Sequence, residues 1–307
     1  MTVHRHEPRI LMCAPDHFSV SYRINPWMDP SSWKSQGVVL EANAHREWLK
    51  LRETLAGLGA AIELVPPAAG QPDLVFTANA AVVMDRTALL ARFRHPERRG
   101  EETPYARAFE TLHARGVIDR IETLPEGIVH EGAGDCVWDR TRRLFWMGYG
   151  PRSDATAAPV IARTFGVETV ALELPDPRFY HMDTTLSPLP RGELMYFPGG
   201  FTKAGLAQIH ARVAPELRLE LGEEDAVTLA ANAVCIGDAI VASAMSPALK
   251  PRLADRGYRP VITPLDSFRR SGGSAFCLTL RLDRVSAETV RPALPRRAKE
   301  RRAGRAA

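Results

Sequence analysis

The stretch FTANAAVVMDRTALLARF, residues 76–93, holds two short apolar segments on either side of a turn, with the polar Asn79 ahead of the first segment. Short runs of apolar and β-branched residues bounded by polar ones predict β-strands, and two such runs joined by a turn predict a strand pair. Because the same unit recurs along the chain, this stretch indicates a fold made of repeated modules.

Four further stretches repeat the unit, each with an Asp, Asn or Ser ahead of its first apolar segment. They are EGAGDCVWDRTRRLFWMGY (131–149) with Asp135, HMDTTLSPLPRGELMYFP (181–198) with Asp183, LAANAVCIGDAIVAS (229–243) with Asn232, and SGGSAFCLTLRL (271–282) with Ser274. We call these five polar residues the anchors, and they follow one another at intervals of 42 to 56 residues. This spacing is too regular for five unrelated hairpins.

Helices are predicted between the strand pairs. Apolar residues recur at helical spacing in 41–58 and 154–165, and more weakly in 204–213. Each segment leads into a short apolar stretch that predicts a third strand, namely AIELVP, VETVALEL and LRLEL. The module is therefore ββαβ, and five modules around an axis leave few open sheet edges. We predict an α/β fold, a five-module pseudo-symmetric α/β-propeller with a central active site.

The two ends of the chain are expected to meet in one module, because RILMCAP (9–15) would supply a strand to the module that contains Cys277. No stretch has the composition of a linker, so 1–290 is predicted to form a single domain. Residues 291–307 carry seven Arg or Lys against one Glu, a net charge of +6 that leaves −2 for the rest. We expect this basic tail to be disordered.

Composition narrows the class of protein. The four cysteines lie far apart without a C-x-x-C pair, which favours a reducing cytoplasmic location over a disulfide framework or a zinc site. No apolar run approaches the roughly 20 residues of a membrane span, so we expect no membrane association. The basic charge lies in the tail rather than on a basic face, so no nucleic-acid partner is expected. The sequence leaves the oligomeric state open, including a homo-oligomer.

Modules around an axis bring the same strand end of each module to the centre, so the anchors and their neighbours are expected to converge there. Cys277 follows the turn at Gly272 and Gly273 in the last module. A thiol in that place is a candidate nucleophile. The alternative is that Cys277 is a small buried apolar residue, as most cysteines are.

A histidine and three acids occupy matching places in two other modules. His181 and Asp183 form an H-x-D pair, whose side chains point to the same face of a strand. Glu131 and Asp135, in HEGAGD, bracket small residues that allow a tight turn and close approach of a ligand. A structural histidine and turn-capping carboxylates are the alternatives. The combination of these groups with a thiol in a separate module favours a catalytic site.

Eight segments of the chain carry a resemblance to a known superfamily. They are INPWMDP, PDLVFTANA, RFRHPERRGEE, VHEGAGD, GYGPRSD, RFYHMDTTL, NAVCIG and SGGSAFCLTL. With these segments in this order, the chain resembles the guanidino-group-modifying (pentein) superfamily of arginine deiminases, dimethylarginine hydrolases and amidinotransferases. The resemblance spans nearly the whole folded chain. It implies the pentein fold and a small-molecule substrate such as arginine, citrulline or a methylated arginine.

The resemblance also implies a role for each matching residue. Cys277 would attack the guanidinium carbon, and His181 would protonate the departing amine and then activate water. Glu131 would hold the guanidinium and orient His181. The implied substrate-binding residues are Asp183 beside the guanidinium, Arg152 at the substrate carboxylate, Arg98 as a second substrate-side arginine, Asn79 beside the reaction carbon, and Asp73 and Asn25 in loops near the amino-acid part.

General chemistry agrees with this set of residues. A planar cation requires carboxylates beside it, and an α-carboxylate matches the fork of an arginine. A substrate guanidinium next to a thiol favours the nucleophilic thiolate. We therefore expect no metal and no organic cofactor, because covalent catalysis by a thiol requires neither.

Two features narrow the choice of reaction. Ala78 and Asn79, in FTANA, stand where dimethylarginine hydrolases and deiminases carry an acid, and the H-x-D pair resembles deiminases, amidinotransferases and arginine dihydrolases. A neutral Asn could accept a neutral ureido group as well as a guanidinium. We expect an arginine dihydrolase, which releases ornithine and ammonia. Dimethylarginine hydrolase, arginine deiminase and amidinotransferase are alternatives, and a non-catalytic amino-acid-binding protein is a different class that has no need of the thiol.

Overall fold

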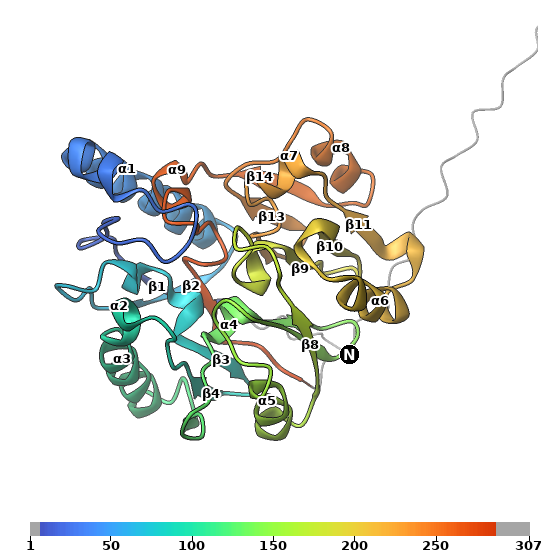
Figure 1. Cartoon of the computed structure of the whole chain (residues 1–307), viewed down its shortest axis with the longest axis horizontal. Coiled ribbons are helices and arrows are strands. Elements are labelled where there is room, and N and C mark those ends of the chain that lie inside the picture. The colour runs from blue at the N-terminus through green and yellow to red at the C-terminus, as the bar shows by residue number, and fades with distance from the viewer. Residues whose placement is uncertain (1–6, 287–307) are drawn as a thin grey trace, which may run out of the picture.

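The computed structural model describes residues 7–286. The predicted tail, 291–307, lies outside the described residues. Between residues 7 and 286 the chain forms five three-stranded sheets around a common centre, with the longer helices on the outside (Figure 1). The prediction of a five-module α/β-propeller is confirmed.

Each sheet is built in the same way, with the first strand antiparallel to the second and the second parallel to the third. The first strands are β3 (Ala81–Met84), β6 (Cys136–Asp139), β9 (Leu186–Pro188), β12 (Val234–Ile236) and β15 (Leu280–Arg281). The second strands are β4 (Thr87–Leu90), β7 (Leu144–Tyr149), β10 (Leu194–Tyr196), β13 (Ala239–Ala242) and β1 (Arg9–Cys13). The third strands are β5 (Arg120–Glu122), β8 (Glu168–Glu173), β11 (Arg218–Glu220), β14 (Arg259–Ile262) and β2 (Ala61–Val65).

A helix separates the second strand from the third in every module, as the ββαβ prediction requires. These helices are α3 (Glu102–Ala114), α5 (Ala157–Phe165), α6 (Lys203–Arg212), α8 (Leu249–Ala254) and α1 (Pro30–Gly57). The other helical segments described are single turns: α2 (Pro96–Arg99), α4 (Gly132–Asp135), α7 (Glu223–Ala226), α9 (Asp266–Arg269), η1 (Pro72–Val75), η2 (Thr77–Ala80), η3 (Met182–Thr184), η4 (Pro198–Gly200) and η5 (Pro215–Leu217).

The helix predicted at 41–58 begins earlier, at Pro30. Asp29 caps its first turn by accepting a hydrogen bond from the backbone N–H of Ser31, and Pro30 occupies the first helical position, where its missing N–H has no cost. The apolar pattern from which the helix was predicted does not extend over these capping residues. The helices predicted at 154–165 and 204–213 correspond to α5 and α6.

Two helices were not predicted from the sequence. Helix α3 buries Tyr105, Ala108, Phe109 and Leu112, which share one helical face. That spacing is present in the sequence and was overlooked. Helix α8 has six residues, too few for a helical period to be recognised.

The two chain ends meet as predicted. In the sheet of β15, β1 and β2, Ile10 lies opposite Arg281 and Leu11 opposite Leu280. Leu11 and Leu280 are buried in the same apolar cluster. This short strand pair closes the ring of modules.

The core lies between neighbouring modules rather than within any one of them. In one cluster, Trp138 of β6 and Phe145 of β7 pack with Val82 of β3 and Leu89 of β4, in the module before them. The described residues form five such clusters. Each sheet is therefore held in place by the apolar side chains of its neighbours.

Hydrogen bonds near the axis link all five modules in a ring. The anchors, which are buried, lie just ahead of the first strands and supply most of these bonds. They run from Asn79 Nδ2 to Glu131 O (3.2 Å), from Met182 N to Asp135 Oδ1 (3.1 Å), from Asn232 Nδ2 to Asp183 O (3.2 Å), from Cys277 N to Asn232 Oδ1 (3.2 Å) and from Ala78 N to Cys277 O (3.1 Å).

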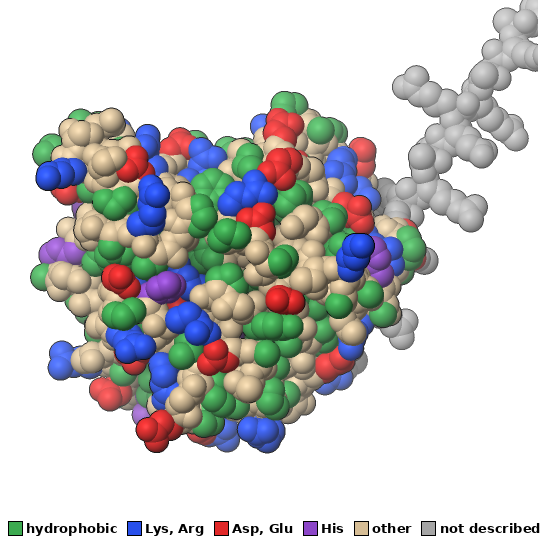
Figure 2. Space-filling model, in the orientation of Figure 1, with side chains coloured by type: hydrophobic (Ala, Val, Ile, Leu, Met, Phe, Trp, Pro, Cys, Tyr) green, Lys and Arg blue, Asp and Glu red, His purple; other side chains and the backbone are tan. Residues whose placement is uncertain are grey.

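Acidic and basic side chains are mixed on the face of the molecule seen in Figure 2. Within residues 7–286, no helix combines the length and the apolar character that crossing a membrane requires.

Closure of the ring at β15 is expected to stabilise the fold. Leu280→Ala should lower the free energy of unfolding by about 3 kcal/mol, because it leaves a cavity beside Leu11. The matched control is Leu64→Ala in β2 of the same sheet, whose side chain is 54% exposed and should cost less than about 1 kcal/mol. Urea unfolding of both variants measures the difference. Equal losses would show that the β1–β15 contact does not stabilise the ring.

Candidate active site

Cys277 lies at the centre of the ring with its thiol against two polar side chains. Sγ is 3.1 Å from Asp183 Oδ2 and accepts a hydrogen bond from Asn232 Nδ2 at 3.1 Å. The side chain is buried, and burial, with a further contribution from the nearby Asp183, raises the pKa of the Cys277 thiol well above its ordinary value. In this arrangement Cys277 is a neutral thiol, and its S–H donates a hydrogen bond to Asp183.

His181 and Glu131 form a second contact pair. His181 Nε2 is 2.9 Å from Glu131 Oε2, and both side chains are buried. Burial lowers the pKa of His181 to about 4, although the hydrogen bond to Glu131 acts in the opposite direction. His181 is therefore a neutral imidazole near pH 7 and is able to accept a proton.

Glu131 also binds the side chain of Arg152. Arg152 Nη1 donates to Glu131 Oε2 at 3.1 Å, so one carboxylate oxygen contacts both His181 and a guanidinium. Burial by itself raises the pKa of Glu131, but Arg152 and His181 outweigh it and leave that pKa below the ordinary value of a glutamate. Glu131 thus remains an anion in spite of its burial.

Arg152 is buried and only partly satisfied. Its guanidinium lies 4.5 Å above the ring centre of Tyr180, and Nη2 donates to the carbonyl of Ile24 at 3.4 Å. Its Nε has no hydrogen-bond partner among the described residues. The structure therefore presents one unpaired cationic donor at this place.

Asp183 presents the opposite case. Its Oδ2 accepts from the Cys277 thiol, whereas Oδ1 is buried and has no partner between residues 7 and 286. Burial raises the pKa of Asp183 to about 7. Buried polar atoms are nearly always hydrogen-bonded in folded proteins, so an orphaned carboxylate oxygen beside a thiol indicates a place where a donor binds.

Two loops that carry predicted site residues meet at Ser271. Asn25 Nδ2 donates to the carbonyl of Ser271 at 3.0 Å, and the hydroxyl of Ser271 donates to Asp73 Oδ1 at 3.3 Å. Asp73 Oδ2 also accepts from the hydroxyl of Tyr22 at 2.8 Å. Asn25 and Asp73 are thus fixed on either side of one segment, six residues ahead of Cys277 in the chain.

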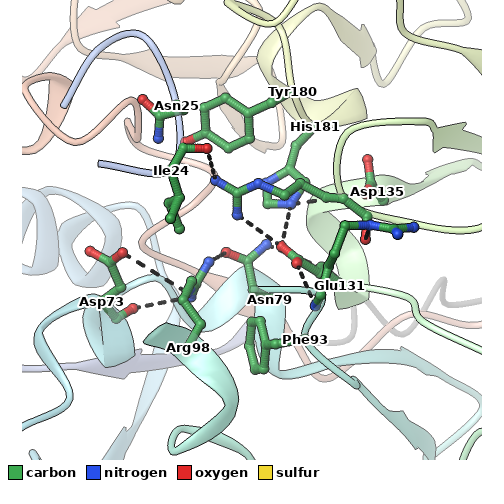
Figure 3. A network of polar contacts seen from close by, with 12 residues as sticks. Ile24, Asn25, Asp73, Asn79, Phe93, Arg98, Glu131, Asp135, Tyr180 and His181 are labelled. Carbon is green, nitrogen blue, oxygen red and sulfur yellow. Dashed lines mark hydrogen bonds and ion pairs between the residues drawn. The ribbon is translucent and has the colours of Figure 1, made fainter. Parts of the chain in front are cut away.

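Asn79 and Arg98 belong to one buried network, seen from close by in Figure 3. Arg98 Nη1 donates to Asn79 Oδ1 at 2.9 Å, and Asn79 Nδ2 donates to the carbonyl of Glu131 at 3.2 Å. Arg98 was expected beside the substrate, and its side chain makes internal contacts with Glu101 and Asp73 as well.

The small residues of HEGAGD let Asn79 approach. Gly132 has a φ of +64°, a conformation that side chains other than glycine rarely adopt. A Cβ atom on Gly134 would lie 2.2 Å from Asn79 Nδ2 and 3.3 Å from His181 Nδ1. A larger residue at 134 would displace Asn79 and press on His181, so the close packing of these side chains requires a glycine there.

Sequence reasoning recognised Asn232 as an anchor but not as a neighbour of the thiol. Its side chain donates to Cys277 Sγ and accepts from the backbone N–H of Cys277. Three further residues were also missed: Glu101, Tyr180 and Ser153, whose hydroxyl accepts from the backbone N–H of Glu131 and donates to Asp135 Oδ2. The repeat itself could have indicated Asn232, because its position matches Asn79 and Asp183. Nothing in the local sequence marks the other three.

The raised pKa of Cys277 has a consequence for its reactivity. A thiol with a raised pKa is protonated at pH 7, so alkylation by iodoacetamide should accelerate about tenfold per pH unit from pH 7 to pH 9. Asp183→Asn removes the negative charge beside the sulfur and should raise the rate at a fixed pH. Mass analysis of the peptide that contains Cys277 follows the reaction separately from the other cysteines. A rate that levels off below pH 8 would contradict the buried neutral thiol.

Comparisons with known proteins indicate the family of this chain. The family model described as N,N dimethylarginine dimethylhydrolase, eukaryotic, matches residues 15–187, more than half of the chain. The bifunctional arginine dihydrolase/ornithine cyclodeaminase ArgZ of Synechocystis sp. is 44% identical over 274 residues, which cover 89% of this chain and 37% of that protein. The N(G),N(G)-dimethylarginine dimethylaminohydrolase of Mycobacterium tuberculosis is 36% identical over 89% of this chain and 85% of its own length.

Solved structures agree with these sequence matches. The N-terminal domain of ArgZ, a cyanobacterial arginine dihydrolase, crystallised as a cysteine-to-serine variant bound to substrate, superposes with a TM-score of 0.83 at 40% identity and covers 91% of this chain and 99% of that one. The chain spans less than two-fifths of the full length of its two cyanobacterial relatives. The chain therefore belongs to the dimethylarginine dimethylaminohydrolase family, within the guanidino-group-modifying (pentein) superfamily that its motifs indicate.

Proposed function

We propose that the protein is a cysteine-dependent hydrolase that converts arginine to ornithine, an arginine dihydrolase. The observation that carries this proposal is the contact between the Cys277 thiol and Asp183, whose second carboxylate oxygen is buried and has no partner among the described residues. A guanidinium nitrogen is the donor that such an oxygen would bind. This hydrogen bond would bring the central carbon of the guanidinium next to the sulfur of Cys277.

The charges around this place suit a planar cation. Asp183 lies on the side of Cys277, and Glu131 holds the neutral His181. A bound guanidinium would stabilise the thiolate of Cys277, because a nearby positive charge lowers the pKa that burial and Asp183 raise. The substrate would in this way activate its own nucleophile.

In the proposed first hydrolysis, these groups act in turn. The thiolate of Cys277 forms a bond to the guanidinium carbon, and the carbon–nitrogen bond to one terminal amine breaks. The proton given up by the thiol returns through His181 to that amine, which leaves as ammonia. His181, again neutral, takes a proton from water as the water attacks the same carbon. The sulfur leaves and free citrulline or its bound equivalent results.

The second hydrolysis needs a site that tolerates a neutral group. A ureido group carries a carbonyl oxygen, which an amide N–H can donate to and a carboxylate cannot. Asn79 supplies such an amide, since Nδ2 has two N–H groups and one of them already binds the Glu131 carbonyl. The thiolate of Cys277 would attack the ureido carbon, and ammonia would leave. Water would then displace the sulfur from that carbon, and the resulting carbamate would lose carbon dioxide to give ornithine.

Relatives support this choice of reaction. Curated proteins of Synechocystis and Nostoc that are 44% and 42% identical are described as bifunctional arginine dihydrolases. The AgrE protein of this group has been crystallised with L-arginine, and its structure superposes on this chain with a TM-score of 0.86 at 40% identity. A cytoplasmic location is part of the proposal and rests on the four separated cysteines.

Dimethylarginine hydrolysis is the second candidate, because the M. tuberculosis relative of that description is 36% identical and aligns over 85% of its length. That reaction would use the same thiol and stop at citrulline. Asn79 argues against it, because the resemblance implies an acid at that place in dimethylarginine hydrolases. The two candidates differ in product, which a direct assay resolves.

The products distinguish the candidates. We expect the protein to convert arginine to ornithine with little free citrulline, and Cys277→Ser to lose nearly all turnover, because a hydroxyl of similar size is not ionised near pH 7. Mass spectrometry of incubations with arginine, citrulline and dimethylarginine identifies the products. Turnover of dimethylarginine alone would replace the first candidate by the second, and an active Cys277→Ser protein would disprove covalent catalysis by this residue.

Arg152 is proposed to bind the substrate α-carboxylate through its unpaired Nε. Arg152→Ala should raise KM for arginine at least about tenfold more than KM for agmatine, which lacks the carboxylate, because a charge-assisted hydrogen bond is lost only with arginine. Some loss is shared by both substrates, since Arg152 also contacts Glu131. Steady-state kinetics on the two substrates separate the effects. Equal increases of KM for arginine and agmatine would show that Arg152 acts only through its contact with Glu131 and does not bind the substrate carboxylate.

A further inference from the structure

The side-chain amide of Asn79 is held in one orientation. An arginine side chain can only donate hydrogen bonds and a backbone carbonyl can only accept them. The oxygen of the Asn79 amide must therefore face Arg98, at 2.9 Å, and its nitrogen must face the carbonyl of Glu131, at 3.2 Å. Figure 3 shows Asn79 between the side chains of Arg98 and Glu131.

Arg98 is itself fixed by Glu101. Its Nε and Nη2 donate to the two carboxylate oxygens of Glu101 at 2.8 and 2.7 Å, the paired geometry that arginine and carboxylate form best. The guanidinium also packs on the face of Phe93, 4.6 Å from the ring centre. Both members of the pair are buried, with Glu101 at 0% exposure. The Glu101 carboxylate is shielded from solvent, and between residues 7 and 286 its ion pair is with Arg98 alone.

A second carboxylate lies near Arg98 but holds it less closely. Asp73 Oδ2 is 4.0 Å from Arg98 Nε, and that oxygen already accepts from the hydroxyl of Tyr22. If Glu101 were neutral, Asp73 would be the nearer remaining anion. Arg98 would then be drawn toward Asp73, and Nη1 would leave the oxygen of Asn79.

We propose that Glu101 is a positioning residue for the reaction, which acts through Arg98 to hold the Asn79 amide with its nitrogen toward the reaction centre. The inference rests on the proposed function, because hydrolysis of a neutral ureido group is the step that depends on a donor at Asn79. Glu101 does not touch the substrate in this scheme. It determines whether the intermediate is carried through to ornithine or escapes as citrulline.

The test replaces Glu101 by the isosteric glutamine and follows products rather than total activity. With Glu101→Gln, hydrolysis of citrulline should slow by about tenfold or more, since a hydrogen bond to a charged group is lost from the relay, while arginine loss slows less. Free citrulline should accumulate. The matched control is Asp139→Asn, which breaks another buried carboxylate–arginine pair three residues apart, with Arg142, outside the site. It should lower stability without changing the ratio of citrulline to ornithine.

A double-mutant cycle with Asn79→Ala separates positioning from a structural role. If Glu101 acts through Asn79, Glu101→Gln should add little to the citrulline accumulation of Asn79→Ala. The proposal would be overturned if the two substitutions changed the rate of citrulline hydrolysis independently, so that their fold-changes multiplied in the double variant. It would also be overturned if Asp139→Asn changed the ratio of citrulline to ornithine as much as Glu101→Gln does. If Glu101→Gln does not fold, the same double-mutant cycle is measured with Arg98→Lys, because lysine keeps the positive charge but cannot form the paired hydrogen bonds of a guanidinium.

The outcomes for the two proposals remain distinct. An unaltered protein that forms no ornithine from arginine overturns the proposed dihydrolase function and, with it, the role of Glu101 in the second step. An unaltered protein that forms ornithine, combined with additive effects in the cycle, overturns the role of Glu101 alone.

Discussion

The ring of hydrogen bonds around the axis is the constraint on which the rest of the structure depends. Each bond joins an anchor, or the residue beside one, to a neighbouring module. The partners of the anchors include Glu131, Met182 and Cys277, which lie in or beside the candidate site. A hydrogen bond contributes only about 1 kcal/mol net, but a buried group left without its partner costs more. The same contacts that close the fold therefore set the distances between the thiol, the histidine and the carboxylates.

Burial of several charges at this centre is tolerated because each has a partner of opposite sign. Glu131 contacts both Arg152 and His181, and Arg98 is compensated by Glu101. Removing one member of such a pair is strongly destabilising because it leaves an isolated buried charge. Asp183 and Asp135 are the exceptions. The nearest partner of Asp183 is a neutral thiol, and burial raises its pKa to about 7. Asp135 accepts hydrogen bonds from Ser153 and the backbone of Met182, and burial raises its pKa well above the ordinary value. Of these two, Asp183 keeps an oxygen without a partner among the described residues, and it lies where a cationic substrate is proposed to bind.

The features of the fold that could be predicted are those that depend on the local order of apolar and polar residues. Strand pairs, their repeat and the joining of RILMCAP to the last module follow from alternating apolar and polar stretches, and the anchors could be found because they recur at matching places. The contact between Arg152 and Glu131 joins residues 21 positions apart across a turn, and no pattern marks it. Glu101 resembles any acid at the start of a helix. Its role depends on complete burial, which only packing reveals.

The groups around Asn79 determine whether an amide or an acid fits at this position. A cation lies on one side of the side chain and a backbone carbonyl oxygen on the other. An aspartate would match the cation but would place a second oxygen 3.2 Å from the Glu131 carbonyl, a contact without a proton between two acceptors. Only an amide satisfies both neighbours. The preference for a neutral amide at position 79 therefore depends on Arg98, on its partner Glu101 and on the turn at Gly132 that brings the Glu131 carbonyl close.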